Sequence, residues 1–219
     1  MTGGGTTLQT PSADSALAAV MASLQRPHVL VDHRLIAPGD EQALCPGEAE
    51  FFQTSVLQVR RQSGAARMVA RRLLRDFGLQ EVPLPRSASG APVWPPGVVG
   101  SLAHDASVAV AAVARRDHVA GLGIDVEPDE PLPANLLDLV TTPEERRRHH
   151  LSLRQGRLLF SIKEAVYKAL CGIDGVLLGF HDIEIELGRA EGCATVSRRR
   201  RVPFAYVTRP RIVALAYLE

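Results

Sequence analysis

The chain has 219 residues, of which 46% are hydrophobic and 22% are charged. This length fits one large domain or two small ones and is sufficient to bury a core. The formal net charge of +1 argues against a dedicated binder of nucleic acid or of acidic membrane surfaces. No apolar run reaches the ~18 residues of a membrane-spanning helix, and residues 1–11 lack the pattern of a secretory signal.

Cysteine and lysine are both used sparingly. The three cysteines are far apart and show no CxxC spacing, which indicates neither a disulfide framework nor a zinc site and favours the cytoplasm. The chain contains only two lysines, Lys163 and Lys168, and takes all its other basic side chains from arginine. Because lysine and arginine are not interchangeable, this pairing marks residues 160–170 as a candidate functional segment.

The first half of the chain begins with a segment, residues 1–12, that we expect to be a mobile tail. Helical spacing, alternation and turn residues then predict, in chain order, a helix over 14–24, a strand over 28–35, one or two helical turns over 46–53, a long basic amphipathic helix over 56–77 ending at Gly78, and a proline-rich loop over 82–97.

The second half is predicted in the same way. Strands are expected over 98–102, 107–114 and 119–127, a capping box where Thr141 and Thr142 precede Glu144 and Glu145, a helix over 154–170 closed by Gly172, and a run of strands over 182–218. The order predicts an α+β fold of two similar halves, residues 13–116 and 117–219, although no strong sequence repeat is visible.

The segment GIDVEP, residues 123–128, carries two carboxylates. Alternate side chains of a strand share a face, so Asp125 and Glu127 point the same way while Val126 points the other way. Adjacent carboxylates repel each other, and a divalent cation such as Mg²⁺, which takes oxygen ligands, relieves that repulsion. On this motif alone, solvated acids at a strand end are the slightly favoured interpretation.

A second motif, FSIKEAVYKAL, spans residues 160–170. Helical spacing places Glu164 and Lys168 on one face, beside a stripe that holds Lys163 and Tyr167. An ordinary surface ion pair, worth ~0.3–0.5 kcal/mol, also explains this spacing. Combined with the acidic strand, however, the helix adds a third carboxylate for a metal and a lysine that can meet a phosphate.

Two further segments offer groups that bind anions. VVGSLAHD, residues 98–105, contains Ser101 and His104, although a lone histidine at a strand end is more often structural. Arginines of the helix over 56–77 form either a solvated face or a cluster of guanidinium groups that could bind phosphate in a bidentate manner. The sequence lacks GxSxG, GxxxxGK[ST] and a complete GxGxxG, which disfavours a serine hydrolase, a P-loop and a dinucleotide site.

Together these segments resemble the 4′-phosphopantetheinyl transferases of the surfactin/enterobactin-synthetase type. Three motifs agree in order and spacing: GAPVWPPGVVGSLAH (residues 90–104), GIDVEP and FSIKEAVYKAL. The resemblance covers roughly residues 60–180. It implies a pseudo-dimer of two α+β halves, with coenzyme A bound between them and a metal site at their interface.

The resemblance also implies an Mg²⁺-dependent enzyme, with Mn²⁺ as an alternative metal. The reaction would move phosphopantetheine from coenzyme A to a serine of an acyl or peptidyl carrier domain and leave adenosine 3′,5′-bisphosphate. Asp125, Glu127 and Glu164 would hold the metal. Glu164 would deprotonate the serine, directly or through a water, and Lys168 would neutralise the diphosphate. The implied catalytic set is thus Asp125, Glu164 and Lys168.

For coenzyme A, the resemblance places His104 at the 3′-phosphate, and the other candidate contacts are Arg60, Arg61, Arg67, Arg86, Ser101, Lys163 and Lys168. The sequence departs from the family in four places. A small residue is usual where Asp105 follows the histidine, and the spacing between Arg60/Arg61 and Arg67 is about one residue shorter than usual. Ala103 precedes the histidine where Ser or Thr is common, and Ser89 stands where a lysine is common, so that Arg86 could take over that phosphate. Asp105 either orients His104 or caps the turn, and the choice between Arg60 and Arg61 stays open.

The partners implied are coenzyme A and carrier proteins or carrier domains of peptide and polyketide synthases, with no nucleic acid and no membrane. Two halves in one chain favour a monomer. One alternative is a catalytically weak homologue that only binds carrier proteins, against which the intact carboxylates and Lys168 argue. A nucleic-acid binder using the arginine runs is disfavoured by the balanced charge and by an aromatic content of 5%.

Overall fold

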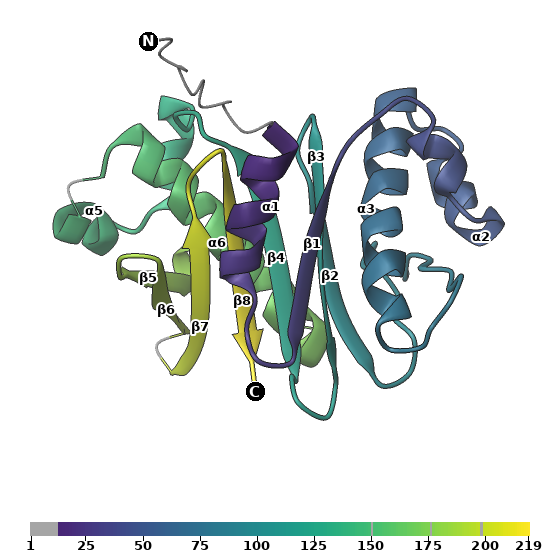
Figure 1. Cartoon of the computed structure of the whole chain (residues 1–219). Helices are drawn as coiled ribbons and strands as arrows, with labels where there is room; N and C mark the ends of the chain where they lie inside the picture. Colours follow the sequence, from purple (N-terminus) through teal and green to yellow (C-terminus); the bar gives the residue numbers. More distant parts are fainter. Residues whose placement is uncertain (1–12, 150, 176, 198) are drawn as a thin grey trace, which may run out of the picture.

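The computed structural model describes residues 13–149, 151–175, 177–197 and 199–219. The expected tail, residues 1–12, lies outside these described residues. Figure 1 shows two β-sheets side by side, each accompanied by a long helix. The predicted α+β class with two similar halves is therefore confirmed.

The first half contains a three-stranded antiparallel sheet of order β1-β3-β2. Its elements are α1 (Ala13–Leu24), β1 (Val29–Leu35), η1 (Asp40–Ala43), α2 (Pro46–Ala49), η2 (Glu50–Phe52), α3 (Leu57–Arg75), β2 (Val98–His104) and β3 (Val108–Arg115).

The second half contains a five-stranded antiparallel sheet of order β4-β8-β7-β6-β5. Its elements are β4 (Gly121–Pro128), η3 (Ala134–Leu136), α4 (Leu137–Val140), α5 (Pro143–His149), α6 (Leu153–Asp174), η4 (Phe180–Asp182), β5 (Ile183–Leu187), β6 (Glu191–Val196), β7 (Arg200–Val207) and β8 (Arg211–Leu218).

The two sheets share one hydrophobic core. Alternate residues of β3, such as Val110 and Ala112, face the same cluster as Val213 and Leu215 of β8, and α1 adds Leu17 to it. The other faces of the sheets pack on separate helices, since α3 covers the first sheet and α6 covers the second. This arrangement joins the halves through apolar burial and leaves β2 beside β4.

The two halves repeat one topology. In the first, β1 pairs with β3 and β3 with β2; in the second, β4 pairs with β8 and β8 with β7. The long helix follows the first of these strands in both cases, and the hairpin β5–β6 is an addition of the second half. β1, α3, β2 and β3 thus correspond to β4, α6, β7 and β8, a repeat that the sequence did not reveal.

Two glycines bring α6 close to β4. A Cβ atom at Gly123 would overlap the backbone carbonyl of Ala165, and one at Gly121 would overlap that of Ala169. Only glycine permits this approach. Because Asp125 and Glu127 follow on the same face of β4, the contact sets them beside the middle of α6.

The predicted end of the last helix is wrong. The helix continues through Gly172 to Asp174, and its C-cap is Gly175, whose φ of 62° lies in the left-handed region. A glycine inside a helix costs only about 1 kcal/mol relative to alanine, so Gly172 alone does not end it. The predicted capping box at α5 is formed by Thr142 and Glu145, which exchange two hydrogen bonds.

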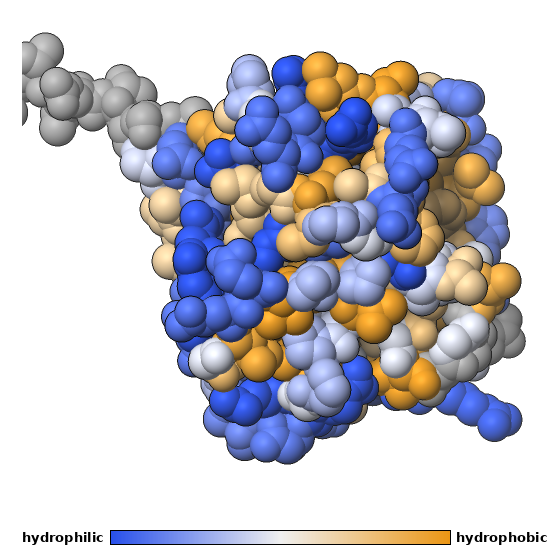
Figure 2. Space-filling model, turned by 90° about the vertical axis from the view of Figure 1, so that its right-hand side faces the viewer, coloured by the Kyte–Doolittle hydropathy of each residue, from blue (hydrophilic) through white to orange (hydrophobic). Residues whose placement is uncertain are grey.

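The surface on the side of α2 and α3 is mixed in character. Hydrophobic side chains there lie between hydrophilic ones (Figure 2), and the exposed ones include Phe51, Val56 and Leu57. Among the described residues, no helix has the length and apolar character needed to cross a membrane.

Candidate active site between the two halves

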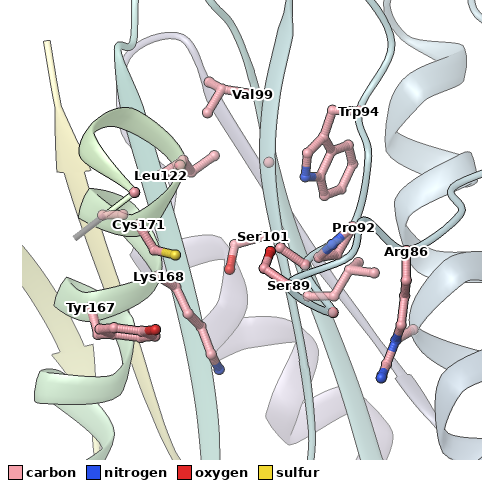
Figure 3. Close-up of a pocket in the computed structure, with 18 of the residues that line it drawn as sticks. Arg86, Ser89, Pro92, Trp94, Val99, Ser101, Leu122, Tyr167, Lys168 and Cys171 are labelled. Carbon is pink, nitrogen blue, oxygen red and sulfur yellow. The ribbon is translucent and has the colours of Figure 1, made fainter. Parts of the chain in front are cut away.

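A cavity of about 510 Å³ opens where the two halves meet. The loop before β2 lines one wall with Arg86 and Trp94, and α6 lines the opposite wall with Lys168. Figure 3 shows these side chains on the two sides of the space, with Ser101 of β2 between them. Trp94 packs against Gly100, where a Cβ atom would overlap the indole ring.

Cationic groups gather along this cavity. The guanidinium of Arg86 lies 4.6 Å from the ring centroid of Phe52, and burial lowers the pKa of Arg86. His104 stands at the end of β2, where desolvation and the positive charges of Lys168 and Arg86 lower its pKa. An anion entering the cavity would offset those charges and favour the protonated imidazole.

Asp125, Glu127 and Glu164 are outside the lining of the cavity, and Asp125 adjoins it through an ion pair with Lys168, which does line it. These three carboxylates are called the acidic rim below. Lys168 Nζ donates to Asp125 Oδ1 over 2.6 Å and to the carbonyl of Ile124 over 3.2 Å. The other oxygen, Oδ2, is buried and has no hydrogen-bond partner among the described residues. A buried carboxylate oxygen without a partner is costly, so this atom marks a position that a cation or a donor would stabilise.

Glu127 and Glu164 add negative charge next to Asp125. Arg157 Nη1 of α6 donates to Glu127 Oε2 over 2.7 Å. Burial and the charge of Asp125 nevertheless raise the pKa of Glu127. Burial raises the pKa of Glu164 as well, and Asp125 adds to this effect while Lys168 opposes it. For both carboxylates, burial outweighs the neighbouring positive charge and disfavours the charged form.

These residues fit a hard divalent cation, but not in a preformed cage. No group of three histidine, cysteine or acidic side chains within the described residues has the geometry to hold a metal ion. The reason is that Lys168 and Arg157 engage Asp125 and Glu127 directly. The donor set consists of carboxylate oxygens, which Mg²⁺ prefers, and Asp125 Oδ2 still lacks a partner among the residues that the structure describes.

Lys163, expected at coenzyme A, lies in the core. Its side chain is fully buried, and its ammonium donates to Glu145 Oε2 over 2.8 Å, to the carbonyl of Val140 over 2.9 Å and to that of Phe180 over 3.0 Å. The ammonium therefore does not face the cavity. Helical spacing alone could not distinguish a stripe directed at the cavity from one directed at α5.

Arg67, also expected at coenzyme A, is largely structural. It lines the cavity but is 2% exposed, and it donates to the carbonyls of Leu84 and Ser63. Burial lowers its pKa to about 10, still well above neutrality. Its guanidinium therefore places a positive charge behind the cavity wall and is not an exposed fork.

The remaining predicted residues divide into two groups. Arg86, Ser101 and His104 line the cavity. Arg60 and Arg61 are outside its lining, and Arg61 pairs with Glu41 over 3.0 Å. For Asp105 the structure supports the capping alternative, because its Oδ1 accepts the backbone amides of Ser107 and Val108.

Three cavity residues were missed by the sequence analysis, and two more stood in its motifs without a role in the site: the first are Arg116, Cys171 and Leu177, and the second are Trp94 and Tyr167. Arg157 was missed as well. It precedes Glu164 by seven residues, which is two helical turns, so helical spacing alone places both on one face. The three cysteines are free thiols, as the spacing predicted.

Comparisons with known proteins match both halves. A family model described as 4′-phosphopantetheinyl transferase N-terminal domain matches residues 47–114. A second, described as 4′-phosphopantetheinyl transferase superfamily, matches residues 121–215. Their boundary falls between the two sheets.

Curated relatives agree with these models. The chain is 38% identical to 4′-phosphopantetheinyl transferase Svp of Streptomyces mobaraensis over 76% of this chain and 70% of the relative. It is 40% identical to 4′-phosphopantetheinyl transferase PptT of Mycobacterium tuberculosis over 64% of this chain and 63% of the relative. Enterobactin synthase component D of Salmonella typhimurium is 33% identical over 55% of this chain and 52% of its own length. The chain belongs to the 4′-phosphopantetheinyl transferase superfamily.

Proposed function

We propose that this protein transfers the 4′-phosphopantetheine group of coenzyme A to a serine of an apo carrier protein. The products are the holo carrier protein and adenosine 3′,5′-bisphosphate. The observation that carries the proposal is the pairing of a cationic cavity with an acidic rim, since Lys168 lines the cavity and also contacts Asp125. Coenzyme A suits that division of charge, because its 3′-phosphate would meet the cationic cavity, while its diphosphate would need Lys168 and a cation held by the acidic rim.

In the proposed binding mode, Arg86 and His104 meet the 3′-phosphate, and the diphosphate extends toward Lys168. Arg86, His104 and Lys168 all line one cavity. Trp94 and Tyr167 supply aromatic surface to exclude water along the same space. Because an anion raises the pKa of a neighbouring histidine, binding of the 3′-phosphate would draw a proton onto His104.

In the proposed chemical step, Glu164 accepts the proton of the carrier serine. The raised pKa of Glu164 makes it a stronger base than a solvated carboxylate. The serine oxygen forms a bond to the β-phosphorus, and the bridging oxygen of the diphosphate leaves with its electron pair. Lys168 stabilises the charge that develops there. Asp125, Glu127 and Glu164 would hold Mg²⁺, or Mn²⁺ in its place, and a bound ion would neutralise diphosphate charge.

The finer assignments follow the same reasoning. Both cavity walls come from one chain, so we propose that a monomer suffices for the reaction. Three free thiols agree with the reducing cytoplasm. Carrier domains of peptide, polyketide or siderophore synthases are the proposed acceptors, because the chain resembles an enterobactin synthase component.

Intact-mass analysis tests the proposal. An apo carrier protein is incubated with this protein, coenzyme A and Mg²⁺, with a parallel reaction in EDTA. A gain of one phosphopantetheine group that disappears in EDTA supports both the reaction and the metal. Binding of coenzyme A without any mass gain on several carrier proteins would instead indicate a non-catalytic carrier-binding protein. Absence of both would overturn the proposed function.

A further inference from the structure

Lys163 of α6 and Glu145 of α5 form an ion pair in which both side chains are fully buried. Glu145 of α5 accepts from Lys163 Nζ through Oε2 and from the backbone amide of Ile185 through Oε1, each over 2.8 Å. The same Oε2 accepts the amide of Thr142. The C-terminal latch, defined here as Glu145 and Lys163, thus ties α6 to α5 and to the start of β5.

The first half contains a counterpart of this pair. Glu48 of α2 is fully buried and accepts from Arg71 Nη1 over 2.8 Å and from the backbone amide of Leu84 over 2.6 Å. Arg67 Nε lies 3.6 Å from the same carboxylate. The N-terminal latch, defined here as Glu48, Arg67 and Arg71, ties α3 to α2 and to the loop before β2.

The local sequence of the two latches is also repeated. Pro46 and Pro143 begin the short helices, and Glu48 and Glu145 occupy the third position of each, where each accepts the amide of its own N-cap residue. A capping bond at an exposed helix needs no such burial. In both halves, however, the capping glutamate is buried and also pairs with a basic residue of the long helix. This pair fastens the short helix to the long one.

The C-terminal latch is adjacent to the proposed base. Lys163 directly precedes Glu164, and consecutive helical residues point about 100° apart. Rotation of α6 that moved Glu164 away from Asp125 would also pull Lys163 from its three acceptors. An unpaired ammonium and an unpaired carboxylate in the core are strongly unfavourable. The orientation of Glu164 is therefore coupled to the buried pair.

We propose that Glu145 and Lys163 are positioning residues that fix the rotation of α6 and so hold Glu164 and Lys168 against Asp125. This inference rests on the proposed function for the role of Glu164. Lys163, the first lysine of the FSIKEAVYKAL motif, would then act within the protein core and not on the ligand. The N-terminal latch fastens α3 and the loop before β2, which carry cavity residues but no proposed metal ligand, so it serves as the matched control for Mn²⁺ affinity and kcat and not for KM.

The test compares Glu145→Gln with Glu48→Gln. Each change is nearly isosteric and replaces one acceptor oxygen of a buried carboxylate with a donor. Three quantities are measured: the Tm, the affinity for Mn²⁺ in the absence of substrates, and kcat and KM for transfer. We expect both variants to lower the Tm by about 6–20 °C. Only Glu145→Gln is expected to lower Mn²⁺ affinity and kcat, by about 10- to 100-fold.

A double variant, Glu145→Leu with Lys163→Met, separates positioning from stability. Replacing both members of a buried ion pair by apolar side chains often restores stability. We expect the double variant to recover most of the lost Tm while Mn²⁺ affinity and kcat stay low, since the buried pair no longer fixes the rotation of α6. If the double variant is unfolded, the comparison between Glu145→Gln and Glu48→Gln at low temperature decides alone.

Two results would overturn the proposal. One is recovery of Mn²⁺ affinity and kcat together with the Tm in the double variant. The other is an equal loss of kcat in Glu48→Gln and Glu145→Gln. If the unaltered protein binds Mn²⁺ but transfers no phosphopantetheine, the proposed function fails while the Mn²⁺ affinities still decide the role of the latch.

Discussion

Each half of the molecule pairs an acidic residue of its first strand with a basic residue of its long helix. Arg72 Nε lies 2.5 Å from Asp32 Oδ2 in the first half, and Lys168 Nζ lies 2.6 Å from Asp125 Oδ1 in the second. The surroundings differ. Two residues beyond Asp32 stands Arg34, whereas Glu127 stands two residues beyond Asp125.

The long helices also differ in charge. Arg67 and Arg72 of α3 are five residues apart, as are Lys163 and Lys168 of α6, so Met68 of α3 corresponds to Glu164 of α6. In the first half, the acids around the corresponding strand have arginine partners: Arg34 pairs with Asp40, and Arg72 pairs with Asp32. In the second half, Asp125 Oδ2 has no hydrogen-bond partner within the part of the chain that the structure describes. The second half thus differs from the first by two additional carboxylates beside an otherwise similar ion pair, and these make it a candidate metal site.

The largest expected effect comes from removing one of those carboxylates. Glu164→Gln should lower transfer by about 10²- to 10⁴-fold, because it removes the proposed base, while coenzyme A binding persists on the other cavity contacts. The raised pKa of Glu164 means that its charged form destabilises the folded state at neutral pH. The variant should therefore show a higher Tm. Met68→Gln, at the corresponding position of α3, should change neither quantity.

The next effect concerns the basic residues. Lys168→Met should lower kcat by about 10²- to 10³-fold, because a charge that meets the developing negative charge is lost. Arg72→Met removes a half-exposed surface pair, so it should cost at most about 1 kcal/mol in stability and leave kcat unaltered. Steady-state transfer kinetics measure kcat, and urea unfolding measures the free energy of unfolding. If both variants lost kcat equally, Lys168 would have no catalytic role that Arg72 lacks.

A smaller effect is expected at Arg157, which engages Glu127. Arg157→Gln removes a competing positive charge from the acidic rim. Isothermal titration with Mn²⁺ should then show about tenfold tighter binding. Weaker binding would instead mean that Arg157 orients Glu127 as a ligand, and that the acidic rim needs this guanidinium.

The smallest effect is the pH dependence of metal binding. The pKa values of Glu127 and Glu164 are both raised above their ordinary range, so protons compete with a cation for these oxygens. Mn²⁺ affinity should rise as pH increases through those raised pKa values and level off above them, by at most about tenfold per pH unit for each proton displaced. Glu164→Gln should flatten this rise. An affinity that does not vary with pH in the unaltered protein would contradict the assignment of either carboxylate.

Periodicity within a segment predicted much of the fold. The apolar and basic spacing of α3 and the alternation of β1 and β4 were sufficient to locate these elements. The end of α6 was not predictable from Gly172, because the left-handed residue that closes the helix is the next glycine, Gly175. The internal repeat was not visible in the sequence either, since only a few positions correspond between the halves. At two of them, α3 has arginine where α6 has lysine.

The candidate site was partly predictable for a related reason. Strand and helix periodicity put Asp125 beside Glu127 and Glu164 beside Lys168, and the structure brings the two pairs together across Gly123. Periodicity could not show that Lys163 turns into the core, because that depends on Glu145, which approaches from another helix. Contacts between distant segments, such as Arg157 with Glu127, follow only from tertiary packing.

A crystal structure with coenzyme A and Mn²⁺ would show directly whether the second half alone holds the metal. We expect a single anomalous peak at bonding distance, about 2 Å, from oxygens of Asp125 and Glu164, beside the diphosphate. We expect none at Asp32. A peak at Asp32 and Arg72, or a bound diphosphate with no peak at Asp125, would contradict this expectation.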